Sequence, residues 1–191
     1  MSLCFSFVAL SEDLGRIAAA AAAYAERGEE IAGVVPAEPA AGERVYLCAF
    51  RGETGGTTWL ALDERSAPVA DRAVIRDAVS IAAMCELAEE VAAGGDLDDL
   101  HSQLVALRVT ENPPGIDAAE DAVLALQNAI GAPPRVASPQ HLDAVGIATR
   151  KLERALGDAS ASPFAEAMKQ GIGSVEQLAK DVEANYKRTL S

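Results

Sequence analysis

The side chains best suited to chemistry are two arginines in a stretch that is otherwise almost entirely apolar. Arg72 and Arg76 lie between Pro68 and Ala93, one helical turn apart, so on a helix they share a face. Two guanidinium groups on one face can hold a carboxylate or a phosphate through paired hydrogen bonds. The spacing therefore predicts a candidate anion site on the 68–93 helix.

Two residues that precede this helix are candidates to complete the anion site. Trp59 lies in an apolar run and Glu64 follows that run directly, so both should lie where the chain leaves the strand and approaches the helix. Glu64 and Asp77 could equally neutralise the arginines as internal ion pairs. Ion pairing is the simpler interpretation of the same residues, and the choice between the two stays open on sequence alone.

No other group of residues predicts a reaction. His101 and His141 each lie early in a predicted helix, where a histidine is ordinarily a surface residue. Asp98 and His101 share a helix face, but the second pair of ligands that a metal centre needs is missing. The segment 53–58 has the composition of a phosphate-binding loop without the lysine and the helix that should follow, so it predicts a hairpin turn. We expect no catalytic residue, no metal and no cofactor.

The elements expected around these residues are a few strands and many helices. Short apolar runs near 3–10, 44–50 and 57–63 predict three strands, because such runs are bounded by turn residues and are too short for buried helices. Ser11 should cap a helix that ends near Gly28. The stretch 33–42, with Pro36 and Pro39, reads as a loop.

Beyond Gly95 the pattern is helical throughout. Leucines and other apolar residues recur at spacings of three and four, which is typical of helices with one apolar seam each. Breaks are expected at 112–115, 132–134, Gly157 and 171–173. The fold class predicted is α+β and predominantly helical: a small three-stranded sheet with covering helices, then a C-terminal helical bundle. The division expected is 1–95 and 96–191, packed as one compact unit, with a sub-boundary at 131–139.

Composition and net charge limit the kinds of partner that we expect. The formal net charge is −13, so the average surface repels phosphate backbones and anionic membranes, and we expect neither nucleic acid nor membrane as a partner. Cys4, Cys48 and Cys85 each lie in an apolar run without metal-ligand spacing, which predicts buried reduced thiols. No secretion signal or membrane-spanning run is apparent. A cytoplasmic location is the expectation that follows.

The segment 138–191 differs from the rest in charge. It carries seven acidic and seven basic side chains, whereas 1–137 carries 22 acidic and nine basic ones, so it is a candidate separate module. Arg150, Lys151 and Arg154 form a basic turn in it. An acidic turn, formed by Asp117, Glu120 and Asp121, could orient such a helix against a neighbour or a second subunit.

The function predicted is a non-enzymatic interaction, scaffold or regulatory protein that self-associates through its helices or binds another protein. The alternative is a small-molecule-binding or enzymatic domain that uses Arg72, Arg76, Trp59 and Glu64 beside the hairpin. The apolar seams of the helices predicted beyond Gly95 favour the first hypothesis, and the paired arginines favour the second.

Overall fold

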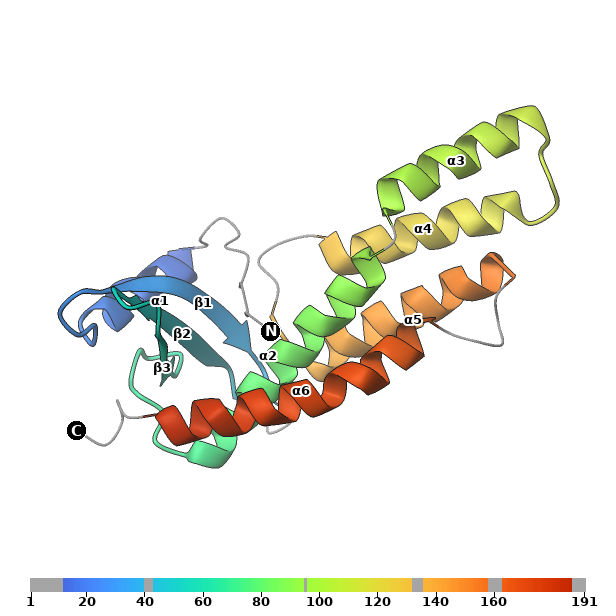
Figure 1. Cartoon of the computed structure of the whole chain (residues 1–191). Coiled ribbons are helices and arrows are strands. Elements are labelled where there is room, and N and C mark those ends of the chain that lie inside the picture. Colours follow the sequence, from blue (N-terminus) through green and yellow to red (C-terminus); the bar gives the residue numbers. More distant parts are fainter. Residues whose placement is uncertain (1–11, 40–42, 95, 132–135, 158–162, 187–191) are drawn as a thin grey trace. The chain divides into compact units, whose positions relative to one another are not determined.

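The fold is predominantly helical α+β with one small sheet, as the sequence predicts. The computed structural model describes residues 12–39, 43–94, 96–131, 136–157 and 163–186. The elements in chain order are α1 (Glu12–Ala22), β1 (Glu29–Ala37), β2 (Val45–Gly52), β3 (Thr57–Leu62), α2 (Arg72–Ala93), α3 (Leu97–Thr110), α4 (Ile116–Gly131), α5 (Pro139–Ala155) and α6 (Pro163–Asn185) (Figure 1). No helix in these ranges combines the length and the apolarity needed to cross a bilayer.

The chain divides into two compact units that are not consecutive in sequence. The first, here called the sheet unit, comprises Met1–Met84, Pro133–Pro139 and Gly173–Ser191. The second, the helical unit, comprises Cys85–Ala132 and Gln140–Ile172. Each unit is therefore built from separate segments of the chain. The boundaries after Met84 and before Gly173 fall inside α2 and α6, so each of these helices contributes residues to both units. The division expected at residue 95 stays a prediction about independent folding.

The sheet is antiparallel with the order β1-β2-β3. All six residues from Val45 to Phe50 are buried in the central strand, as suits a run that is apolar on both faces and lies between two neighbouring strands. The hairpin between β2 and β3 turns at the predicted place, and Gly55 there has a φ of +80°. Such a φ suits glycine because no Cβ opposes it.

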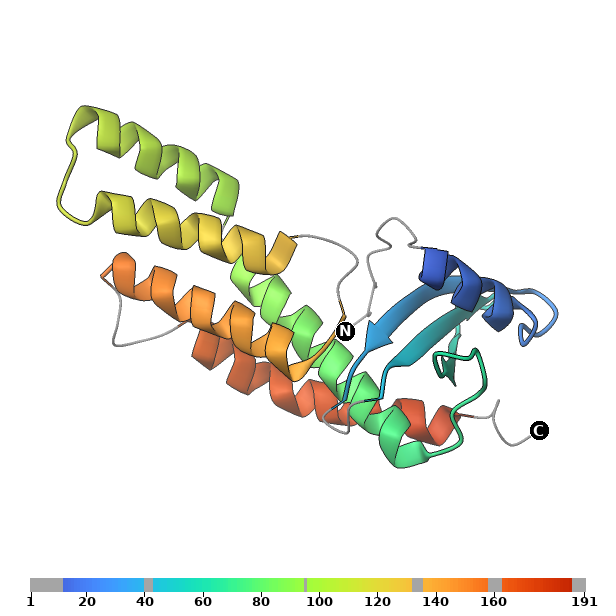
Figure 2. The same cartoon turned by 180° about the vertical axis from the view of Figure 1, so that it is seen from behind.

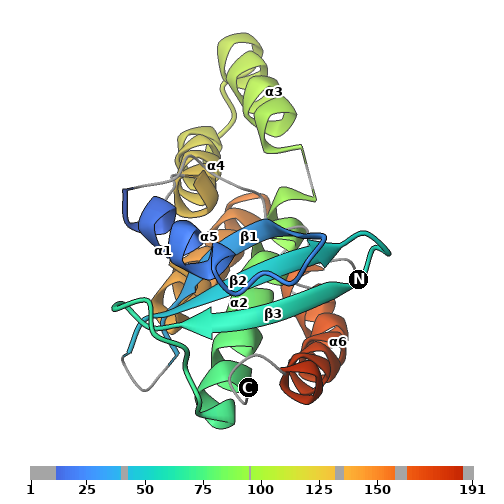
Figure 3. The same cartoon turned by 90° about the vertical axis from the view of Figure 1, so that its left-hand side faces the viewer.

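Each face of the sheet has its own helical cover in the sheet unit. Leu14, Ile17 and Ala21 of α1 pack on the face formed by alternate residues of β2 and β3. Figure 3 shows α1 on one side of the sheet, with α2 and α6 on the other. Tyr186 lies at the β3 edge: its hydroxyl accepts a hydrogen bond from the Ala61 N–H (3.1 Å) and donates to the Val69 carbonyl (2.9 Å).

The helical unit has one apolar core. Its buried members on α4 and α5 include Val123, Leu126, Val145 and Leu152, and α3 contributes only Leu104. The other α3 leucines are half-buried against this core, so α3 has the thinnest packing of these helices. The predicted breaks at 112–115 and at Gly157 are confirmed, since α3 ends at Thr110, α4 begins at Ile116 and α5 ends at Ala155.

The first strand of the sheet was not predicted. Residues 29–37, predicted to lie after a helix and partly in the loop 33–42, form β1, and α1 ends at Ala22 instead of near Gly28. Pro36 suggested a loop because proline cannot donate to a strand ladder, but β1 is an edge strand, where that loss is tolerated. The outer edge there is met by Ala137, whose N–H donates to the Pro36 carbonyl (2.9 Å). The strand expected at 3–10 lies outside the described residues.

The break expected at 171–173 is wrong, because α6 runs unbroken through both glycines. At Gly171 an added Cβ would lie 2.1 Å from Cδ2 of Leu87, whereas at Gly173 nothing lies within 4 Å. Gly171 therefore permits a close approach of α6 to Leu87 of α2 and does not end the helix. The 68–93 helix was placed correctly but begins at Arg72.

Candidate functional site

The arginines of the predicted anion site lie on the surface, one turn apart at the start of α2. Nε of Arg76 lies 3.5 Å from Oδ1 of the neighbouring Asp77, and both side chains are about half exposed. Arg72 is exposed, and its side chain makes no hydrogen bond or ion pair within the part of the chain that the structure describes. The two guanidinium groups thus remain accessible, and the ion pair of Arg76 with Asp77 is long and solvated.

The other two members of the predicted site have different surroundings. Trp59 is buried in β3, and Glu64 lies exposed in the turn that follows this strand. It is Arg16 of α1 that reaches this turn: its guanidinium donates to the Glu64 carbonyl (2.9 Å) and to Oγ of Ser66 (2.8 Å). Ser66 has a φ of +64°, so Arg16 stabilises a strained turn.

A cavity of about 580 Å³ lies in the helical unit, where α2, α3 and α4 meet. Its polar lining is already engaged. Oδ1 of Asp98 accepts a hydrogen bond from the side-chain amide of Gln127 (2.7 Å), and Oδ1 of Asp96 accepts one from the Asp99 N–H (3.0 Å) as the cap of α3. The described residues contain no cluster of three or more metal-ligating side chains.

A partly buried group of acidic side chains lies on the part of α2 that belongs to the helical unit. Nε2 of His141 lies 2.6 Å from Oε1 of Glu89, and both side chains are largely buried, which corrects the prediction that His141 is a surface residue. One turn before Glu89, burial, together with the negative charges of Glu90 and Glu89, raises the pKa of Glu86 to about 7. The signal available in the sequence was a run of glutamates on an otherwise apolar helix.

The acidic turn of α4 is also partly buried. Oε2 of Glu120 forms an ion pair with Nη1 of Arg108 on α3 at 3.0 Å, and the Glu120 side chain is only 10% exposed. This corrects the grouping of Glu120 with Asp117 and Asp121, which are the residues of that turn that face solvent. The pair ties α3 to α4, because a buried carboxylate needs a cationic partner.

Large exposed apolar side chains gather on the helical unit. Leu124 of α4 is 42% exposed and Ile147 of α5 is 60% exposed. Others on the same unit are Val109, Leu156 and Ile172. Figure 2 shows α4 and α5 side by side and antiparallel. We define the α4–α5 face by seven exposed residues of these two helices: Asp117, Asp121, Leu124, Ile147, Arg150, Lys151 and Arg154.

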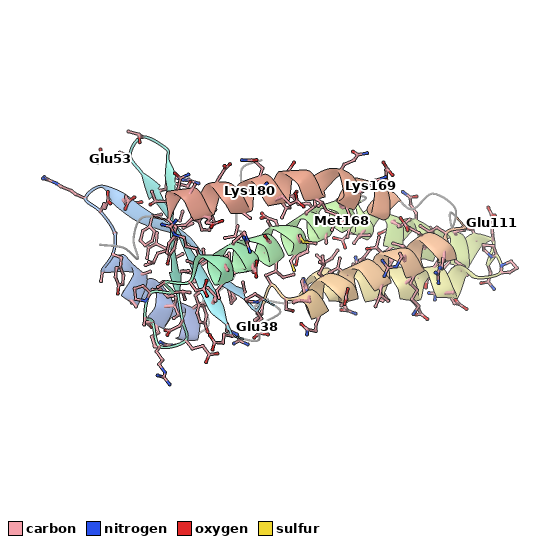
Figure 4. All side chains as sticks on the ribbon, turned by 90° about the horizontal axis from the view of Figure 1, so that it is seen from below. Glu38, Glu53, Glu111, Met168, Lys169 and Lys180 are labelled. Atoms are coloured by element: carbon pink, nitrogen blue, oxygen red, sulfur yellow. The ribbon has the colours of Figure 1, made fainter. Side chains whose placement is uncertain are left out.

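On α6 the inward and outward sides are also distinct. Figure 4 shows Met168 turned toward the neighbouring helices and Lys169 turned away. Met168 packs against the core of the helical unit. Lys169 is exposed and belongs to a different part of the surface from the α4–α5 face.

Comparison with family models, with curated proteins and with solved structures finds no match for this chain.

Proposed function

We propose that this chain is a non-enzymatic interaction protein that self-associates through its helical unit. The observation that carries the proposal is the placement of the exposed large apolar side chains. Five of the six found in the described residues, Tyr24 being the sixth, belong to the helical unit. Exposed apolar side chains that gather on one part of a protein are typical of interaction surfaces.

Sedimentation velocity of the full chain tests this proposal. We expect the weight-average sedimentation coefficient to rise as the protein concentration is raised from about 1 to about 200 µM, the range in which weak association becomes visible. A coefficient that stays at the monomer value throughout would remove self-association from the proposal.

A second candidate function is anion binding at the start of α2. The specific observation in its favour is that Arg72 has no partner and Arg76 has only the long contact with Asp77 within the described part of the chain. Two accessible guanidinium groups on one helical turn can hold a phosphate.

Isothermal titration with inorganic phosphate separates the two candidates. The anion-binding candidate requires saturable heat that is lost in the double variant Arg72→Gln/Arg76→Gln and kept in Arg154→Gln, a matched loss of one exposed guanidinium on α5. Heat that is absent, or equal in all three proteins, would eliminate it.

The proposal includes a reducing compartment such as the cytoplasm. Two observations support it: Cys48 and Cys85 are both buried free thiols, and burial raises the pKa of the Cys48 thiol to about 12, so that it stays protonated and unreactive. Fractionation of the native cell tests this location, and recovery outside the cytoplasmic fraction would contradict it.

A further inference from the structure

We propose that the α4–α5 face is a two-fold interface, on which the acidic helix of one copy packs against the basic helix of a second copy. This inference rests on the self-association proposed above, and it names both the surface and the partner. Other apolar positions of the helical unit, such as Val109 on α3, lie outside the interface.

The charges on this face are separated by helix. On α4 the charged side chains of the face are Asp117 and Asp121, whereas on α5 they are Arg150, Lys151 and Arg154. Asp143 is also exposed on α5, but it lies one turn before Ile147, away from the charged end of the face. None of these five side chains of the face makes a hydrogen bond or an ion pair within the part of the chain that the structure describes. Each copy therefore presents one negative and one positive stripe, and both stripes are available to a partner.

The acidic residues of α4 and the basic residues of α5 lie at the same positions along the two antiparallel helices. The beginning of α4 and the end of α5 lie at the same end of the helical unit in Figures 1 and 2. Asp117 is in the first turn of α4 and Arg154 is in the last turn of α5. Moving four residues away from this end leads from Asp117 to Asp121 on α4 and from Arg154 to Arg150 on α5. Moving three residues further reaches Leu124 on α4 and Ile147 on α5.

This matching selects the orientation of the symmetry axis. A two-fold axis parallel to the helices exchanges α4 with α5 and leaves levels unchanged, so each aspartate faces an arginine or lysine of the other copy. Leu124 then meets Ile147 at the centre, twice. An axis across the helices would place α4 on α4 and reverse the positions along it. The charged end of the face on each helix would then meet the other end of the same helix in the copy, and no opposite charges of the face would pair.

The size of the face sets the strength of the contact. Two helices of 16 and 17 residues are each about 25 Å long and pack about 10 Å apart. The face therefore covers roughly 500 Å² on each copy, or about 1,000 Å² in total, which is the lower end for specific interfaces. We expect a reversible dimer in the micromolar range that weakens as salt is added.

Two variants of opposite charge test the interface. Asp117→Lys/Asp121→Lys makes the whole face positive, and Arg150→Glu/Lys151→Glu/Arg154→Glu makes it negative. Each variant alone should be monomeric, with the dissociation constant raised at least about tenfold over that of the unchanged chain. An equimolar mixture should form a heterodimer, because both helix pairs are then complementary again.

The matched control reverses charges elsewhere on the helical unit. Glu111→Lys/Lys169→Glu changes two exposed residues, at the end of α3 and on α6, that lie outside the face (Figure 4). This control should dimerise as the unchanged chain does. Far-ultraviolet circular dichroism verifies that every variant remains helical, and light scattering coupled to size exclusion gives the masses.

The outcomes separate the interface from the function. Loss of dimer in each charge variant and its recovery in their mixture support the interface. An unchanged chain that self-associates while both charge variants associate equally well overturns the interface and leaves the proposed function standing. An unchanged chain that stays monomeric at all concentrations overturns both.

Discussion

At the scale of single residues, Glu86 of the helical unit combines burial with like-charged neighbours. One of its carboxylate oxygens, Oε2, is buried without a hydrogen-bond partner in the described part of the chain. A buried carboxylate in this state favours the protonated form, because burial penalises the charge. The ordinary pKa of 4.5 rises to about 7 in the folded protein.

This shift predicts how stability depends on pH. Between pH 4.5 and about 7 the folded protein holds a proton at Glu86 that the unfolded chain releases. The contribution of Glu86 to stability is therefore fully present below pH 4.5 and is lost as the pH rises through about 7. Glu86→Gln, which carries no charge, should raise the free energy of unfolding at pH 8 by about 1–2 kcal/mol after allowance for partial exposure, and change it little at pH 4.5.

Urea unfolding of the variant and of the unchanged chain at both pH values checks this difference. Glu176→Gln, at an exposed position of α6, serves as the control and should change stability equally at both. An effect of Glu86→Gln that does not grow with pH would contradict the assignment of the buried charge.

At the scale of elements, replacing either of the two glycines of α6 by alanine should change stability, and in opposite directions. Gly171→Ala brings a methyl group against Leu87, whose Cδ2 would be only 2.1 Å away. Leu87 is buried, so it has little room to move, and we expect a loss of about 1–3 kcal/mol. Gly173→Ala meets nothing within 4 Å and should stabilise the helix by about 0.5–1 kcal/mol.

Thermal and urea unfolding of the two single variants measure both effects with the same chemical change. Equal shifts in the two variants would show that α6 does not pack closely on Leu87. Stabilisation by Gly171→Ala would show that these glycines only weaken the helix.

The glycines also show where sequence patterns are decisive and where they are not. The central strand was predictable, because a run apolar on both faces, such as Val45–Phe50, is buried on both faces. The edge strand β1 was missed, because whether a proline is tolerated depends on which strand has a free edge, and that is a property of the whole sheet. Gly171 was misread for the same reason, since its close neighbour Leu87 is 84 residues away in sequence.

The candidate site was predictable only in part. The accessible positions of Arg72 and Arg76 follow from their spacing on a helix that is otherwise apolar. The burial of Glu120 and His141 does not, because it depends on Arg108 and Glu89, which other helices supply. The separation of charge between α4 and α5 could be read as stripes from the sequence, but their common level depends on how the two helices pack side by side.

At the scale of the whole molecule, both units depend on residues from the C-terminal quarter of the chain. The core of the helical unit includes Val145, Ala148 and Leu152 of α5. The sheet unit includes Tyr186, which directly follows α6, is only 2% exposed and binds the backbone of β3. The neutral charge of 138–191 therefore belongs to a segment that helps to build both units, and we expect no detachable module there.

Truncation after residue 137 tests this dependence. Removal of each large buried side chain costs about 2–5 kcal/mol, and the truncation removes several from each unit, whereas a domain is stable by only about 5–15 kcal/mol in total. The fragment 1–137 should therefore lack cooperative unfolding in urea.

The single tryptophan, Trp59, is buried in β3, so its fluorescence reports directly on the sheet unit. A chain that ends at Tyr186 keeps every described residue and should unfold cooperatively, with the emission of a buried tryptophan before the transition. Cooperative unfolding of 1–137 with the same initial emission would show that the sheet forms without α5 and α6, and that 138–191 is a module after all.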